Sequence, residues 1–165
     1  MIKRIVILIL ILTPIFTFSQ GAPKLEIDWI TLGKAEEFAK KYDKNILILF
    51  YRPGCEYCEK MKQTTLKDPR IIQIINENFL PVMINGKGKD PITYNKKTYV
   101  NDHPAPEDAP WRHNLYVELV DPVKGNYYWP DVIIINGMHE KITQFPGFQS
   151  KEQLLRGLNP FIKNK

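Results

Sequence analysis

The most constraining feature of the sequence is an apolar run that ends beside a pair of cysteines. Residues 45–51 read Asn-Ile-Leu-Ile-Leu-Phe-Tyr, and Arg-Pro-Gly then separates them from Cys55. A continuous apolar run of this length, bounded by polar residues, is typical of a strand buried on both faces of a sheet. Residues 55–66 can form a helix. The sequence therefore places Cys55 and Cys58 where a buried strand turns into a helix.

The remaining periodicity predicts an α/β chain. The strand at 131–135 is strongly β-branched, and Asn136-Gly137 after it predicts a two-residue hairpin turn to the last strand. The order favours one central mixed β-sheet flanked by helices, with parallel early strands and an antiparallel end. The expected helices cover 31–42, 55–66, 69–78, 111–120 and 150–161, and the further strands cover 79–85, 131–135 and 141–145.

Residues 86–110 differ from their surroundings because they are polar and rich in proline and glycine. We expect an insertion on a compact domain there rather than a second domain. Within it, residues 92–94 and 98–100 are expected to pair as a small hairpin around a turn at 95–97.

The N-terminus reads as an export signal. Lys3 and Arg4 precede an apolar stretch over residues 5–18, and Thr17 and Ser19 are small enough to flank a cleavage site near Gln20. The alternative is an uncleaved membrane anchor formed by residues 5–18, but this stretch is shorter than the ~20 residues that a span needs. The prediction is a signal peptide over 1–19 and a domain over 20–165, located in the periplasm or otherwise exported.

Composition excludes several classes of protein. The 165 residues have a net charge of +5, and removing Lys3 and Arg4 with the signal lowers it to +3. So small an excess gives no reason to expect a nucleic-acid partner. Two cysteines are too few for a disulfide scaffold or a four-cysteine zinc site, and the three histidines lack paired zinc spacing. We expect neither a metal nor a cofactor.

The Cys-Glu-Tyr-Cys motif predicts redox chemistry at a helix N-terminus. The helix dipole and the free N–H groups there lower the pKa of a thiol, and the thiolate is the reactive form. Cys55, expected in an exposed first turn, would be the nucleophile, and Cys58 would resolve the mixed disulfide. Three alternatives stay open: a structural disulfide, half of a metal site, and a chance occurrence of the spacing. A loop this short would be a poor structural staple.

Three segments together resemble the thioredoxin superfamily. Residues 45–61 resemble its strand and active-site helix, 128–135 resemble its cis-proline segment, and 147–154 resemble its final glycine and helix. The insertion resembles that of exported thioredoxin-like proteins. The resemblance implies a thioredoxin-like fold in which Pro130 is cis and lies against the cysteine pair. An open backbone edge at Trp129 and Pro130 would then bind a substrate chain.

The resemblance implies a thiol–disulfide oxidoreductase whose substrates are proteins with cysteines or disulfides, and a membrane or soluble redox partner. One departure is Leu49, which stands where thioredoxins have a buried aspartate that helps deprotonate the resolving thiol. This departure favours an alternative, a binding module of the same fold with an inert Cys55–Cys58 disulfide and the insertion as its docking surface.

Overall fold

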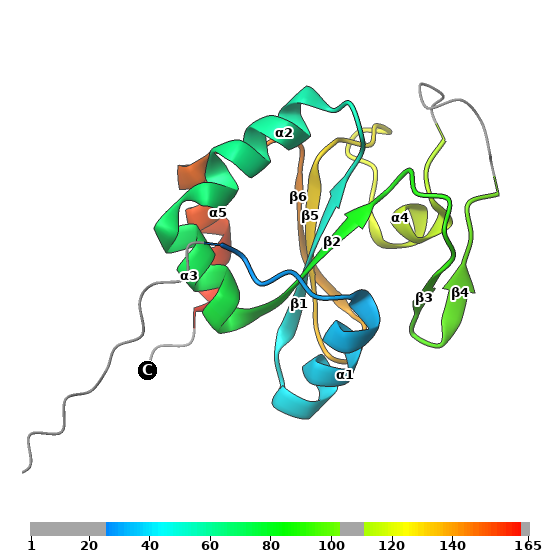
Figure 1. The fold of residues 1–165 in the computed structure, drawn as a ribbon, viewed down its shortest axis with the longest axis horizontal. Coiled ribbons are helices and arrows are strands. Elements are labelled where there is room, and N and C mark those ends of the chain that lie inside the picture. The colour runs from blue at the N-terminus through cyan, green and yellow to red at the C-terminus, as the bar shows by residue number, and fades with distance from the viewer. Residues whose placement is uncertain (1–25, 103–110, 163–165) are drawn as a thin grey trace, which may run out of the picture.

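A four-stranded mixed sheet forms the centre of the computed structural model, which describes residues 26–102 and 111–162 (Figure 1). The predicted signal peptide lies outside the described residues. β1 pairs in parallel with β2 and antiparallel with β5, and β5 pairs antiparallel with β6. This confirms the predicted mixed sheet. In the order β2-β1-β5-β6, the strands are β2 (Phe79–Asn85), β1 (Asn45–Tyr51), β5 (Asp131–Ile135) and β6 (Lys141–Pro146).

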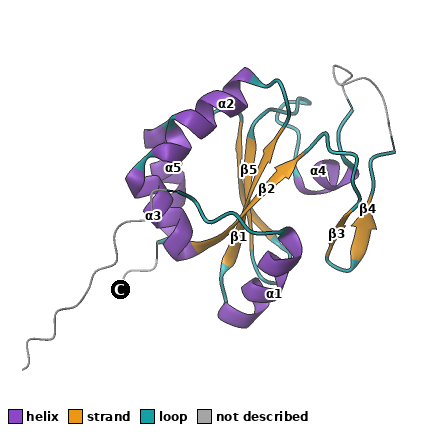
Figure 2. Cartoon of the chain, in the orientation of Figure 1, coloured by secondary structure: helices purple, strands orange, loops and turns teal. Residues whose placement is uncertain are grey.

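Helices cover both faces of the sheet (Figure 2). One face carries α2 (Glu56–Gln63), α3 (Pro69–Asn78) and α5 (Lys151–Leu158). The other carries α1 (Leu32–Tyr42), α4 (Asn114–Leu119) and a hairpin of β3 (Ile92–Tyr94) and β4 (Lys97–Tyr99). None of the described helices has the length and apolar character needed to cross a membrane. The predicted α/β fold class is confirmed.

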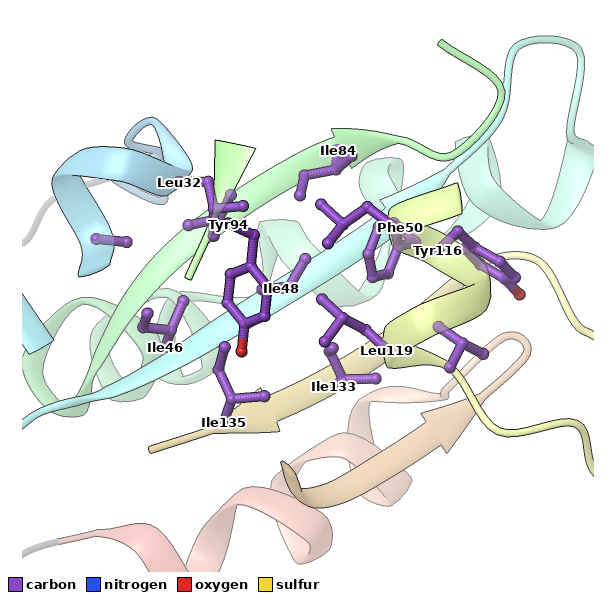
Figure 3. Close-up of a cluster of buried hydrophobic side chains, with 14 of the residues drawn as sticks. Leu32, Ile46, Ile48, Phe50, Ile84, Tyr94, Tyr116, Leu119, Ile133 and Ile135 are labelled. Atoms are coloured by element: carbon purple, nitrogen blue, oxygen red, sulfur yellow. The ribbon is translucent and has the colours of Figure 1, made fainter. Parts of the chain in front are cut away.

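β1 is buried on both faces, as its composition predicts. Leu47 and Leu49 join the core beneath α2, α3 and α5. Ile46, Ile48 and Phe50 point into the opposite core beneath α1 and α4 (Figure 3). The five residues are at most 2% exposed. Because consecutive side chains of a strand alternate between faces, one apolar strand supplies the centre of two cores.

The hairpin of the insertion belongs to the same core as the sheet. Tyr94 and Tyr99 are buried in the cluster that contains β1 and α4 (Figure 3 labels Tyr94). The hairpin turn has two residues, Asn95 and Lys96, both at positive φ, so the second strand begins one residue before the prediction. Positive φ at both positions is the geometry of the two-residue hairpin turn whose twist matches paired strands.

Helices α2 and α4 are shorter than predicted, and side-chain hydrogen bonds to the backbone lie near the ends where they stop short. α2 ends at Gln63, where a 3₁₀ turn over Thr65–Lys67 follows and the Thr65 hydroxyl donates to the Gln149 carbonyl at 2.7 Å. α4 begins at Asn114 rather than at residue 111, since the His113 Nδ1 atom accepts the N–H of Leu115 at 3.1 Å. An imidazole in this role is a cap that the helical spacing does not reveal.

The connection between β5 and β6 also differs from the prediction. It spans residues 136–140 instead of a two-residue Asn136-Gly137 turn, and pairing resumes between Ile135 and Lys141. The Asn136 side chain accepts the N–H groups of Met138 and Glu140 at 2.9 and 3.0 Å. These bonds stabilise a wider loop, in which His139 rather than Gly137 has positive φ.

The last helix begins with a capping box, in which Ser150 and Gln153 bind each other's backbone N–H. It ends at Leu158, and a 3₁₀ turn over Asn159–Phe161 completes the segment predicted as helical to residue 161. Leu154 and Leu158 face the core beneath β5.

One acid is fully buried in the sheet. Asp131, at the start of β5, has no exposed surface, and its Oδ2 accepts from the Gln144 amide at 3.1 Å. No group in the described part of the chain bonds its Oδ1. Burial raises the pKa of this carboxyl to about 8, against the effects of the Gln144 hydrogen bond and the Lys141 charge. Asp131 is therefore mostly protonated at neutral pH.

This protonation predicts a pH dependence of stability. Between pH 3.8, the ordinary pKa, and about 8, the folded Asp131 keeps a proton that the unfolded chain has lost. The contribution of protonated Asp131 to the free energy of unfolding is fully present below pH 3.8. It is lost as pH rises toward about 8, with a slope of up to ~1.4 kcal/mol per pH unit. Urea unfolding across pH 4–8 is expected to show this slope in the wild type and not in Asp131→Asn. Exposed Asp43, which has the left-handed backbone that asparagine tolerates, provides the control Asp43→Asn. Equal slopes in the wild type and Asp131→Asn would contradict the prediction.

Two helical glycines provide a matched test of packing. A Cβ on Gly157 of α5 would lie 2.4 Å from Phe145, whereas one on Gly33 of α1 meets no atom within 4 Å. Gly157→Ala is expected to lower the free energy of unfolding by ~1–3 kcal/mol. Gly33→Ala is expected to raise it by up to ~1 kcal/mol. Urea unfolding measures both free energies. Similar stabilities for the two variants would contradict the prediction and show that the Phe145 ring moves aside without loss of stability.

Candidate functional site

The two cysteines lie at the N-terminus of α2, directly after β1. Cys55 is the N-cap residue, and its Sγ accepts the N–H of Cys58 at 3.1 Å. The pair forms a disulfide with 5.2 Å between the Cα atoms. Gly54 before it has a φ of +65°, a conformation that glycine adopts readily and that brings the chain from the strand into the helix. A thiolate at Cys55 would receive both this N–H and the positive end of the helix dipole.

The burial of Cys55 differs from the prediction of an exposed first turn. Cys55 is 4% exposed and Cys58 is 1% exposed. Both cysteines are thus nearly buried, and Cys55 is the more exposed of the two. The N-cap position turns its side chain back toward the helix backbone, where Sγ binds the Cys58 N–H, instead of outward to solvent.

Charges of both signs surround the motif. Glu56 and Glu59 lie in the first turn of α2, and their charges oppose a thiolate at Cys55. The Glu59 carboxylate pairs with Lys62 at 2.9 Å. The Lys60 ammonium lies 4.9 Å from the centre of the Phe148 ring. Because the nearby side-chain charges act in opposite directions, we assign the stabilisation of a Cys55 thiolate to the N-terminus of α2.

The peptide bond between Trp129 and Pro130 is cis, as predicted. Pro130 precedes β5, which runs antiparallel to β1, so it lies at the edge of the sheet from which the cysteine loop departs. Its carbonyl accepts the N–H of Gly147 at 2.8 Å. The next residue, Phe148, contacts Tyr57 of the cysteine motif, with ring centres 6.5 Å apart. This series of contacts links the proline segment to α2.

The Trp129 ring is held by packing. It stacks on Tyr116 with ring centres 4.4 Å apart, and a Cβ on Gly86 would lie 2.3 Å from it. Because Gly86, the first residue of the insertion, has no Cβ, the backbone there can pass directly against the Trp129 ring. The role of Trp129 and Pro130 in binding a substrate chain stays a prediction.

Tyr116 is a residue whose importance the sequence did not reveal. It is fully buried, packs edge-to-face on Phe50 and donates its hydroxyl to the Tyr128 carbonyl at 2.8 Å (Figure 3). It therefore fixes the backbone just before Trp129 and Pro130. The sequence predicts only a helix over 111–120 here, and the bond to Tyr128 joins segments that come together through the fold.

The buried acid of the structure does not replace the one missing at Leu49. Leu49 pairs with Val132, and both belong to the core beneath α2. Asp131 pairs with Phe50, whose side chain lies in the opposite core. Since directly paired residues share a face of a sheet, Asp131 and Leu49 point to opposite sides. The Asp131 carboxyl therefore faces away from the core beneath α2, the helix that begins after Cys55.

The chain matches the thioredoxin-like domain family over residues 32–161. Among curated proteins, spermatogenesis-associated protein 20 of Rattus norvegicus is 26% identical over 106 residues. That match covers 63% of this chain and 13% of the rat protein, so the chain corresponds to a small part of its relative.

Solved structures share the fold at low sequence identity. A thioredoxin from Thermus thermophilus superimposes with a TM-score of 0.57 and 16% identity, covering 82% of this chain and 86% of that one. A disulphide isomerase from Xylella fastidiosa Temecula1 gives a TM-score of 0.52 and 15% identity, covering 83% and 98%. At identities this low, the superpositions show that the fold is shared and nothing further.

The fold, the family match and the cysteine pair agree with one another. A thioredoxin-like sheet with a CxxC pair at the N-terminus of the following helix supports a thiol–disulfide oxidoreductase. The family match spans the cysteine pair, the cis-proline segment and the last helix. The chain therefore belongs to the thioredoxin-like domain family.

Proposed function

We propose that the protein is an exported oxidoreductase that reduces or exchanges disulfides in other proteins through Cys55 and Cys58. The observation that carries the proposal is the geometry of the pair: a disulfide closed across one turn at a helix N-terminus, with the Cys58 N–H directed at Cys55 Sγ. This arrangement stabilises a thiolate at Cys55 whenever the disulfide opens.

The first step begins from the reduced pair. The Cys55 thiolate attacks a substrate disulfide, so that a bond forms between Cys55 Sγ and one substrate sulfur while the substrate S–S bond breaks. The displaced substrate sulfur leaves as a thiolate and takes a proton from water. Cys55 is assigned this role because it caps the helix and is the more exposed of the two cysteines.

The second step releases the substrate. The Cys58 thiol loses its proton, its sulfur attacks Cys55 Sγ, and the second substrate sulfur departs as a thiolate. Two electrons have then passed from the pair to the substrate, and the pair is left as the disulfide of the structure. Another cycle requires two electrons from a membrane or soluble redox partner. The same steps in reverse oxidise a substrate dithiol.

Export is supported by residues 1–19, whose positive start, apolar stretch and small residues near Gln20 fit a cleaved signal. An exported compartment would permit the disulfide to persist. The named functions of relatives agree with this chemistry, since one similar structure is a thioredoxin and another a disulphide isomerase.

A catalytically weak binding module is the second candidate. Two observations favour it: the leucine at position 49, and the 4% exposure of Cys55. In that case the disulfide would be structural and the insertion would dock a partner. Deleting the insertion is a poor test, because Tyr94 and Tyr99 are part of the core. Disulfide exchange by the intact protein distinguishes the two functions.

Substitution of the resolving cysteine should trap the intermediate. Reduced Cys58→Ser is expected to form a mixed disulfide with insulin, because Cys55 can attack and no second thiol releases the product. Mass spectrometry under non-reducing conditions would detect the adduct, and dithiothreitol should reverse it.

Cys55→Ser is the matched control, and it should form no such adduct at position 58 and should lose insulin reduction. If Cys55→Ser reduces insulin at the wild-type rate, or if Cys58→Ser forms no adduct, the proposed exchange mechanism is wrong.

Tyr116 is expected to act as a positioning residue for the substrate-binding edge. Tyr116→Phe removes the hydroxyl that holds the Tyr128 carbonyl but keeps the stack on Trp129. We expect KM for insulin to rise about threefold or more, with little change in kcat or in the reduction potential, and a stability loss of ~1 kcal/mol.

The control for this variant is Tyr94→Phe. Tyr94 also donates its hydroxyl to a backbone carbonyl, that of His139, but in the hairpin away from Pro130. It should lose stability without a change in KM. An unchanged KM in Tyr116→Phe would limit Tyr116 to a structural role.

A further inference from the structure

A cavity of about 290 Å³ lies beside the cysteine loop. Pro53 forms one side and Asn85 forms another. β1 and β2 are parallel, Tyr51 pairs with Asn85, and the Gly86 N–H donates to the Tyr51 carbonyl at 2.8 Å. Both strands therefore end at the same edge of the sheet, and the chain continues from one into the cysteine motif and from the other into the insertion (Figure 1). Ligands of α/β proteins commonly bind at such an edge.

The loop that forms this cavity is held by hydrogen bonds within it and by bonds from two residues outside it. The Asn85 side chain accepts the N–H of Lys87 at 3.0 Å, and the Gly88 N–H donates to the Asn85 carbonyl at 2.9 Å. The Asn101 amide binds the Gly88 carbonyl at 2.8 Å. The buried His113 ring, through Nε2, bonds the Asp90 carbonyl at 3.2 Å. Because its backbone is fixed at several points, the loop needs little backbone ordering when a ligand binds.

Cationic and aromatic side chains line part of the cavity. Among the described residues that form it, Lys87 and Lys89 are basic and Asp90 is acidic. The Lys87 ammonium lies 5.6 Å from the ring centre of Trp111, which forms an aromatic wall and is 8% exposed. Lys87 itself is half-buried, so its charge is screened less by water than that of an exposed lysine. These features fit a carboxylate ligand and disfavour a basic one.

We propose that this cavity binds the carboxylate of an Asp or Glu side chain of a substrate protein, near the cysteine that reacts with Cys55. The inference rests on the proposed function and adds a substrate preference to it. Pro53 is two residues from Cys55, so their Cα atoms are at most ~7 Å apart. A substrate chain bound through sulfur to Cys55 would thus reach the cavity with a residue two or three positions away.

The test uses blocked peptides that contain one internal disulfide, with either Glu or Gln two and three residues from each cysteine. The rate of peptide reduction by the protein is measured with dithiothreitol as the reductant. We expect kcat/KM to be about fivefold higher for the Glu peptide at low salt, and the preference to fall as salt increases. The variant Lys87→Gln/Lys89→Gln should lose the preference.

The control Lys96→Gln/Lys124→Gln changes the net charge equally at two exposed residues that do not line the cavity. It should keep the preference for Glu. Equal rates for the two peptides with the wild type, or the same decrease in both double variants, would overturn the proposed site.

A binding measurement separates this inference from the proposed function. Cys55→Ser/Cys58→Ser is titrated into a labelled Glu peptide with serine in place of cysteine, and fluorescence anisotropy reports binding. If the wild type reduces neither peptide but binding occurs and requires Lys87 and Lys89, the proposed function fails and the carboxylate site stands. If both peptides are reduced equally and no binding occurs, the function stands and the site is wrong.

Discussion

The burial of β1 between two layers is the constraint on which the rest of the structure depends. β1 hydrogen-bonds to β2 on one side and to β5 on the other, so it has no free edge. Its apolar side chains anchor a core on each face. A strand with these neighbours cannot slip by one residue without exchanging its two sets of side chains between the cores. The end of β1 is thereby fixed, and with it the point where Cys55 begins α2.

Aromatic contacts connect the cysteine edge of the sheet to the insertion. Phe50 near the end of β1 packs on Tyr116, and Tyr116 stacks on Trp129. Gly86, the first residue after β2, lies so close to these two rings that a Cβ on it would be 2.3 Å from Trp129 and 3.1 Å from Tyr116. The segment before Pro130 is thus supported by β1, by α4 and by the start of the insertion together. The insertion is part of the structure that shapes the site, which is consistent with the burial of Tyr94 and Tyr99.

The sequence predicted those features that depend on neighbouring residues. The periodicity identified the strands and helices, and the predicted helix over 69–78 agrees with α3, which has Asp68 as its N-cap and Pro69 as its first residue. Errors arose where a side chain binds a distant or unexpected backbone group. His113 caps α4, which begins three residues after the predicted start, and Asn136 stabilises a wider loop after β5. Thr65, which was predicted to lie in α2, binds the Gln149 carbonyl from the 3₁₀ turn that follows this helix. None of these bonds has a periodic signal: the Thr65 bond joins residues 84 positions apart, whereas the His113 and Asn136 bonds are local but leave no mark in the spacing of apolar residues.

The candidate site divides in the same way. The motif and its place after a strand are local, so Cys55 and Cys58 were identifiable, and the resemblance pointed to Pro130. The low exposure of Cys55, the role of Tyr116 and the cavity beside Pro53 depend on segments that meet only in the folded chain. Sequence reasoning therefore identified the reacting atoms better than their surroundings.

The positions of the three acids nearest to the site in the chain, Asp131, Glu56 and Glu59, bear on proton transfer. Leu49 places hydrocarbon beneath α2, and the Asp131 carboxyl faces the opposite core. The acids that α2 itself contributes in its first turn, Glu56 and Glu59, are exposed, and Glu59 is paired with Lys62. Under the proposed mechanism, the proton that leaves Cys58 would pass to water rather than to a buried carboxylate. Resolution therefore depends on solvent reaching a pair that is nearly buried while oxidised.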